Sequence, residues 1–125
     1  MNPQRNPVGW FEIYVQDLAR AKAFYESTFA VKLEKLPSPG LEMLAFPMKP
    51  ENPGCGGALI RYEGKPSGDG GTLIYFSCED CAVEAARAVK SGGRVFKEKF
   101  SIGPYGFIAL IFDSEGNMVG LHSTK

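Results

Sequence analysis

The side chains best suited to move a proton are Glu12 and His122, which lie on two segments with strand-like patterns near opposite ends of the chain. His122 is the only histidine. If folding opposes these two side chains, they could act as a general base and its orienting partner. They could also hold a metal ion weakly, with water completing its shell. We favour a third interpretation, a buried pair that fixes strand register or orients a ligand, because buried polar groups need partners.

A second motif with possible chemistry is the C-x-x-C spacing of Cys78 and Cys81. A structural zinc ion would need two further ligands nearby, and a redox pair would need its first cysteine at a helix N-terminus. We expect Cys78 to point into a helix-packing core and Cys81 to start a helix. The spacing is therefore interpreted as a chance occurrence.

The elements that must position these residues follow a duplicated pattern. A shift of 63 positions places Asp17 on Asp80 and Gly57 on Gly120, and it superposes two runs of the same hydrophobic order. The sequence predicts helices over 18–30 and 80–91, capped by the two aspartates, with Gly92 and Gly93 as left-handed caps after the second helix. It predicts strands over 8–15, 32–36, 41–46, 58–62, 72–78, 94–100, 107–112 and 117–122.

This order describes an α+β fold of two βαβββ modules, with a curved mixed sheet inside and two helices outside. The 125 residues are expected to form one domain, with module 1 over about 8–62 and module 2 over about 72–122. The Gly-rich segment 63–71 is the expected seam between the modules.

The composition limits the possible partners and location. Fourteen basic and fourteen acidic residues balance without a run of either sign, which argues against nucleic acid or an anionic membrane as a partner. No apolar stretch is long enough to span a membrane, and the start lacks a signal-peptide core. Three cysteines, an odd number, favour a reducing compartment. We therefore expect a cytoplasmic protein.

Three segments in this order resemble the vicinal-oxygen-chelate superfamily, which includes glyoxalase I, bleomycin-resistance proteins and extradiol dioxygenases. They are residues 15–25 (VQDLARAKAFY), 91–95 (SGGRV) and 113–117 (DSEGN). Residues 9–13 and 119–122 look like a branch of single-domain, glyoxalase-related proteins of undefined activity. The resemblance implies a cup formed by the curved sheet, and a homodimer.

In metal-dependent members of this superfamily, the first and last strands of each module supply the ligands. Motif spacing carries those four places to Trp10, Gly57, Leu73 and Gly120. None of these side chains offers a donor to a divalent cation. We therefore expect no metal cofactor at the usual site, with displaced binding of a divalent metal left as an alternative.

The same alternation gives the cup its other residues, because side chains two apart on a strand share a face. Glu12, Tyr75 and His122 lie two positions beyond three of the vacant places. The glycines are expected to leave room for a ligand between aromatic walls. The predicted ligand-binding residues are Trp10, Tyr14, Gly57, Leu73, Tyr75, Tyr105 and Gly120, with Glu12 and His122 as candidate catalytic residues.

The sequence thus predicts a protein that binds a small aromatic or apolar molecule in a metal-free cup. One alternative is a lyase or isomerase that uses Glu12 and His122. Another is a metal-dependent glyoxalase or dioxygenase whose ligands lie at displaced positions. The sequence leaves open whether the protein is an enzyme.

Overall fold

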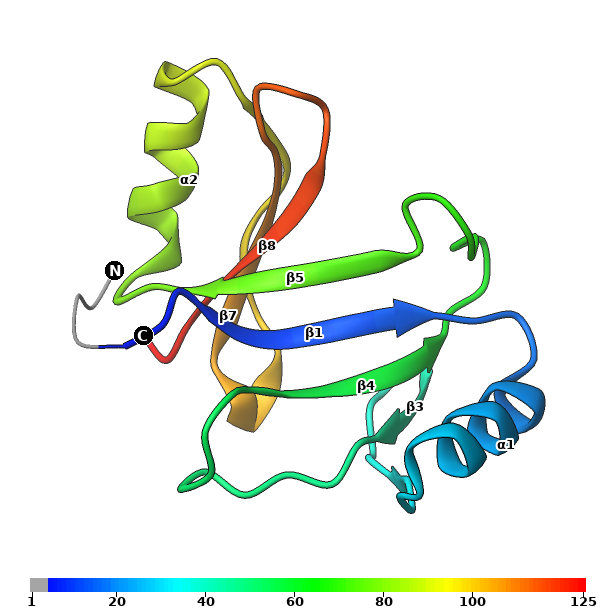
Figure 1. The fold of residues 1–125 in the computed structure, drawn as a ribbon. Helices are drawn as coiled ribbons and strands as arrows, with labels where there is room; N and C mark the ends of the chain where they lie inside the picture. The colour runs from blue at the N-terminus through cyan, green and yellow to red at the C-terminus, as the bar shows by residue number, and fades with distance from the viewer. Residues whose placement is uncertain (1–4) are drawn as a thin grey trace. The chain divides into compact units, whose positions relative to one another are not determined.

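The computed structural model describes residues 5–125 and contains the duplicated order of elements that the sequence predicts (Figure 1). The elements are β1 (Val8–Tyr14), α1 (Leu18–Phe29), β2 (Glu34–Lys35), β3 (Glu42–Ala45), β4 (Gly56–Arg61), β5 (Thr72–Ser77), α2 (Cys81–Lys90), β6 (Arg94–Ser101), η1 (Gly103–Tyr105), β7 (Phe107–Phe112) and β8 (Met118–Ser123). Apart from the short 3₁₀ turn η1, this is βαβββ twice. The α+β class is confirmed.

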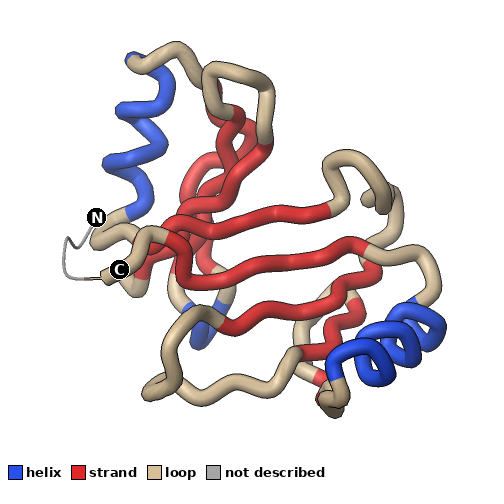
Figure 2. Tube along the Cα trace, in the orientation of Figure 1, coloured by secondary structure: helices blue, strands red, loops and turns tan. Residues whose placement is uncertain are grey.

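The chain divides into two compact units, which we call the N-terminal unit (residues 10–72) and the C-terminal unit (residues 5–9 with 73–125). In the N-terminal unit the strand order is β2-β3-β4-β1, and β1 runs parallel to β4. In the C-terminal unit the order is β6-β7-β8-β5, and β5 runs parallel to β8. Each unit carries one α-helix, and the C-terminal unit also contains the short 3₁₀ helix η1 (Figure 2). The strand pairing is therefore duplicated together with the order of elements.

Both helices begin at the aspartates that the sequence indicates as caps. The Asp17 carboxylate accepts the Arg20 N–H at 2.9 Å, and the Asp80 carboxylate accepts the Ala82 N–H at 3.0 Å. Each cap satisfies a backbone donor that has no partner inside the helix. At the far end of α2 only Gly92 has a positive φ, of 98°, so the prediction of a left-handed Gly93 is wrong. At Gly93 a side chain would instead meet the carbonyl oxygen of Phe112.

The strands differ from the prediction mainly at β4, which begins at Gly56 rather than Ala58. Glycine is a weak strand former, so the sequence favours a loop at residues 56 and 57. They nevertheless pair with Trp10 and Phe11 of β1. The β2 strand is shorter than predicted, with two residues.

The core of the C-terminal unit lies where α2 covers one face of its strands. Five buried side chains form this core: Cys81, Ala85, Ala109, Ile111 and Leu121. Small residues on α2 let the helix approach the sheet closely, and the larger aliphatic side chains of β7 and β8 fill the contact. Because Leu121 faces α2, its neighbours Gly120 and His122 face the other way.

No helix within residues 5–125 combines the length and the apolar character that crossing a membrane requires.

The left-handed residue at the end of α1 can be tested by substitution. Ala30 caps this helix with φ 54° and ψ 47°, a left-handed conformation that glycine adopts without steric cost. Ala30→Gly is expected to raise the free energy of unfolding by up to about 1 kcal/mol. The matched control is Ala23→Gly inside α1, which is expected to lower it by about 1 kcal/mol. Urea unfolding measures both, and a lower midpoint for Ala30→Gly than for wild type would contradict this account.

Candidate functional site

The N-terminal unit fixes a carboxylate between two aromatic side chains of its own strand. Glu12 on β1 is only 8 % exposed. Its Oε2 accepts the indole N–H of Trp10 at 3.1 Å, and its Oε1 accepts the hydroxyl of Tyr14 at 2.7 Å. The ammonium of Lys65 lies 5.1 Å from the centre of the Tyr14 ring. Trp10, Glu12 and Tyr14, which the sequence predicts on one face of a strand, therefore form one connected cluster.

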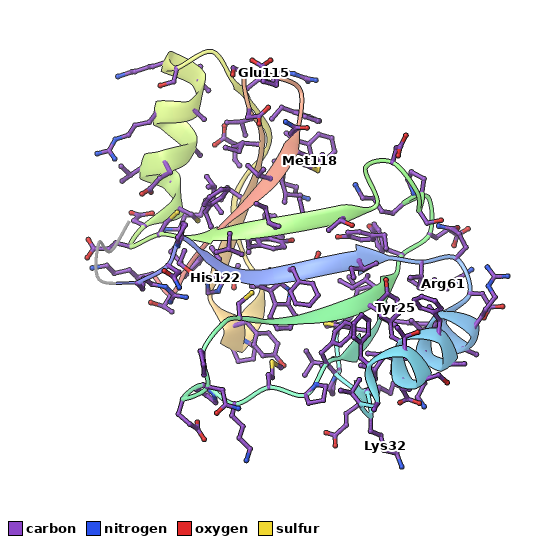
Figure 3. The ribbon with its side chains drawn as sticks, in the orientation of Figure 1. Tyr25, Lys32, Arg61, Glu115, Met118 and His122 are labelled. Carbon is purple, nitrogen blue, oxygen red and sulfur yellow. The ribbon has the colours of Figure 1, made fainter. Side chains whose placement is uncertain are left out.

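The opposite face of the same strands is covered by α1. The ring of Phe11 lies 5.5 Å from that of Phe46, and Phe46 lies 5.6 Å from Tyr25 of α1, centre to centre. Tyr25 is labelled in Figure 3. Since neighbouring residues of a strand point to opposite faces, Trp10 and Glu12 face away from α1.

This arrangement corrects the predicted place of Gly57. A side chain at Gly57 would meet the ring of Phe11, so Gly57 belongs to the face that α1 covers and not to the face of Trp10. The partner of Trp10 across the strands is Gly56. The two helix caps, Asp17 and Asp80, are 63 positions apart. The two glycines that face away from the helices, Gly56 and Gly120, are 64 positions apart, so the 63-residue shift selects Gly57 instead of Gly56. A one-residue offset in a strand reverses every side chain.

The N-terminal unit contains a hollow that the sequence did not reveal. The side chains of Met48 and Trp10 both lie against Gly56. Met48, which is 47 % exposed, also lines a hollow of about 440 Å³. The other residues around this hollow are Lys32, Glu34, Lys35, Leu36, Ala45, Phe46, Pro47, Lys49 and Asn52. The Pro-rich segment after β3 was the only sequence signal, and its conformation does not follow from residue types.

In the C-terminal unit, Tyr75 and Gly120 form a pair across β5 and β8. The ring of Tyr75 occupies the place that a side chain at Gly120 would take. The space over this glycine is therefore filled by the chain itself. Leu73, two residues before Tyr75, is buried and apolar.

His122 lies on β8 (labelled in Figure 3) and contacts the turn η1 that follows β6. Its Nε2 lies 2.6 Å from the carbonyl oxygen of Tyr105 in η1. A carbonyl oxygen can only accept, so Nε2 carries the hydrogen and the Nδ1 of the neutral ring is the basic nitrogen. Gly106, with φ 105°, brings the same turn against the carbonyl oxygen of Ser123. The Tyr105 ring is exposed.

Glu12 and His122 belong to different units, and each has partners within its own unit. Their interaction with each other stays a prediction. The predicted ligand-binding residues likewise divide between the units: Trp10, Tyr14 and Gly57 belong to the N-terminal unit, and Leu73, Tyr75, Tyr105 and Gly120 to the C-terminal unit.

The residues at the four places that the family resemblance implies do not fit a metal centre. The four positions carried over, Trp10, Gly57, Leu73 and Gly120, have no side-chain atom that coordinates a divalent cation. Within residues 5–125, no three His, Cys, Asp or Glu side chains cluster in a way that could hold a metal ion. We therefore derive no chemistry through a metal.

The C-x-x-C pair sits at the start of α2, as expected from the sequence. Cys81 is buried, and its backbone N–H donates to the Ser123 hydroxyl at 3.0 Å. Cys78 packs against the core of the C-terminal unit. Burial, reinforced by the negative charge of Glu84, raises the pKa of the Cys78 thiol from an ordinary 9.0 to about 11. A reactive redox cysteine needs the opposite shift.

The chain is similar to known proteins in sequence pattern and in fold. A family model described as Glyoxalase/Bleomycin resistance protein/Dioxygenase superfamily matches residues 8–121. No curated protein matches the sequence significantly. Methylmalonyl-CoA epimerase from Mycobacterium tuberculosis is similar in structure, with a TM-score of 0.68 and 16 % identity over 95 % of this chain and 88 % of that one.

Two further structures are comparably similar. A methylmalonyl-CoA epimerase variant from Streptomyces coelicolor, in complex with 2-nitronate-propionyl-CoA, gives a TM-score of 0.67 at 18 % identity over 95 % of this chain and 94 % of that one. A hypothetical protein from Bacillus halodurans gives 0.69 at 15 % identity over 94 % of both chains. At these identities the likeness concerns the fold alone.

The raised pKa of the Cys78 thiol can be tested by measuring its rate of alkylation. A pKa two units above the ordinary value leaves about 100-fold less thiolate at pH 8, so iodoacetamide is expected to modify Cys78 about 100-fold more slowly in the folded protein than in urea. Glu84→Gln removes the neighbouring charge and is expected to accelerate the reaction in the folded protein. Peptide mass spectrometry measures both rates. Equal rates for folded and unfolded wild type would refute the assignment.

Proposed function

Because the chain belongs to the glyoxalase/bleomycin resistance protein/dioxygenase superfamily, we propose that it binds a small molecule with an aromatic or apolar body, without a metal, at the hollow that Met48 lines. The observation that carries this proposal is the hollow itself. Its volume of about 440 Å³ falls within the range of small-molecule sites. An apolar floor, formed in part by Ala45, Phe46 and Met48, suits an apolar body.

Met48 connects the hollow to the Trp10 cluster. It is a flexible, half-exposed side chain that touches the same glycine as the indole. Glu12 acts as a positioning residue in this cluster, because its carboxylate fixes the indole N–H and the Tyr14 hydroxyl.

Trp10 is the only tryptophan and lies against the same glycine as Met48, so its fluorescence is the probe for binding near Met48. Neutral 4-nitrobenzyl alcohol, whose nitroarene quenches indole emission, is expected to quench Trp10 saturably, and dialysis against EDTA is expected to leave the affinity unchanged. Met48→Glu is expected to weaken binding at least about 10-fold, because it places a charge on the apolar floor. Val83→Glu on α2 is the matched control, since Val83 is 44 % exposed and Met48 47 %.

Two results would contradict the proposal. One is quenching that rises linearly with concentration and is the same in wild type and Met48→Glu. The other is an equal loss of affinity in Met48→Glu and Val83→Glu.

A second candidate function, proton transfer in a lyase or isomerase, is favoured by one observation. The bond from His122 Nε2 to the Tyr105 carbonyl assigns the basic lone pair to Nδ1, as a general base requires. Under this alternative, Glu12→Gln and His122→Ala would abolish turnover without weakening binding.

Exchange of an acidic C–H in D₂O separates the two functions. Methylmalonyl-CoA, the ligand named for one similar structure, is the probe. If the protein only binds small molecules, the α-hydrogen of this thioester exchanges at the buffer rate. Faster exchange that is lost in both Glu12→Gln and His122→Ala would establish proton transfer instead, and NMR follows the signal directly.

A further inference from the structure

The rim of the hollow beside Met48 carries an excess of positive charge. Its titratable residues are Lys32, Glu34, Lys35 and Lys49, which give three ammonium groups against one carboxylate. The chain as a whole is balanced, with fourteen basic and fourteen acidic residues. The hollow is therefore a local departure from the average charge, and it combines this charge with an apolar floor.

The three lysines reach the hollow from separate segments. Lys32 follows α1, Lys35 lies on β2, and Lys49 opens a turn after β3 that closes through the Asn52 N–H donating to the Lys49 carbonyl at 3.0 Å. Pro50, the second residue of this turn, restricts its backbone. Folding thus brings Lys49 to the rim that Lys32 and Lys35, three residues apart in the sequence, also line.

The three cations differ in how far the protein already neutralises them. Lys32 lies near Glu26, whose carboxylate also pairs with Lys22 at 3.0 Å, and Lys32 points away from the ribbon in Figure 3. Within residues 5–125, neither Lys35 nor Lys49 forms an ion pair. Glu34, on the same rim, and Glu51, in the turn, are the nearest acidic residues along the chain.

We infer that the ligand of this hollow carries an anionic group, a carboxylate, sulfonate or phosphate, attached to its apolar body, and that Lys35 and Lys49 bind this group. The inference rests on the proposed function and specifies its ligand class. The apolar body contacts Phe46 and Met48, while the anion stays at the hydrated rim. Lysine acts there as a point charge, so the anionic part of the affinity falls with ionic strength.

A matched pair of probes tests the inference by quenching of Trp10. 4-Nitrobenzoate and 4-nitrobenzyl alcohol share one ring and differ in charge. At low salt the anion is expected to bind about 10-fold more tightly than the alcohol, and this advantage is expected to shrink in 0.5 M NaCl. Lys35→Gln/Lys49→Gln is expected to abolish the advantage. Lys90→Gln/Lys97→Gln, which removes two lysines of the C-terminal unit, is expected to retain it.

The outcomes separate the inference from the function on which it rests. Saturable binding of both probes with equal affinity would overturn the anionic ligand and leave the small-molecule site standing. Absence of saturable binding by either probe would overturn both. Loss of the advantage in the control variant as well as in Lys35→Gln/Lys49→Gln would assign it to overall charge, and this too would overturn the inference.

Discussion

The buried carboxylate of Glu12 is the constraint around which the N-terminal unit is arranged. Burying an unpaired charge is costly, and hydrogen bonds to a charged group contribute about 1.5–3 kcal/mol each. Trp10 and Tyr14, two residues away on either side, supply such bonds at 3.1 and 2.7 Å. The same two bonds fix an indole and a phenol on the face away from α1. A structural requirement thereby produces an oriented aromatic surface on this face of the N-terminal unit.

Aromatic rings cover glycines in both units, but on different faces. The Phe11 ring takes the place of a side chain at Gly57 on the face of α1, and the Tyr75 ring does so at Gly120 on the face away from α2. A glycine in a strand loses packing, and a cross-strand ring restores it. These glycines accommodate the chain's own side chains. Space for a ligand is found instead at the loop that contains Met48.

Sequence rules predicted those features of the fold that depend only on residues close together in the chain. The caps at Asp17 and Asp80, the order of elements and the shared face of Trp10 and Glu12 all follow from short patterns. The face on which Gly57 lies could not be predicted from such patterns. The second module has one more residue than the first between its helix and its last strand, and this offset reverses the face without any sequence signal. The hollow depends on how the segment after β3 packs, which is a tertiary property. The homodimer, the cytoplasmic location and the Glu12–His122 pair stay predictions.

The indole N–H resonance of Trp10 provides the most direct test of the central claim. If Glu12 fixes this group beside the ligand site, the proton exchanges slowly with solvent, its resonance moves on addition of 4-nitrobenzoate, and Glu12→Gln both shifts it and speeds its exchange. A rapidly exchanging indole proton that neither the ligand nor Glu12→Gln affects would contradict the account.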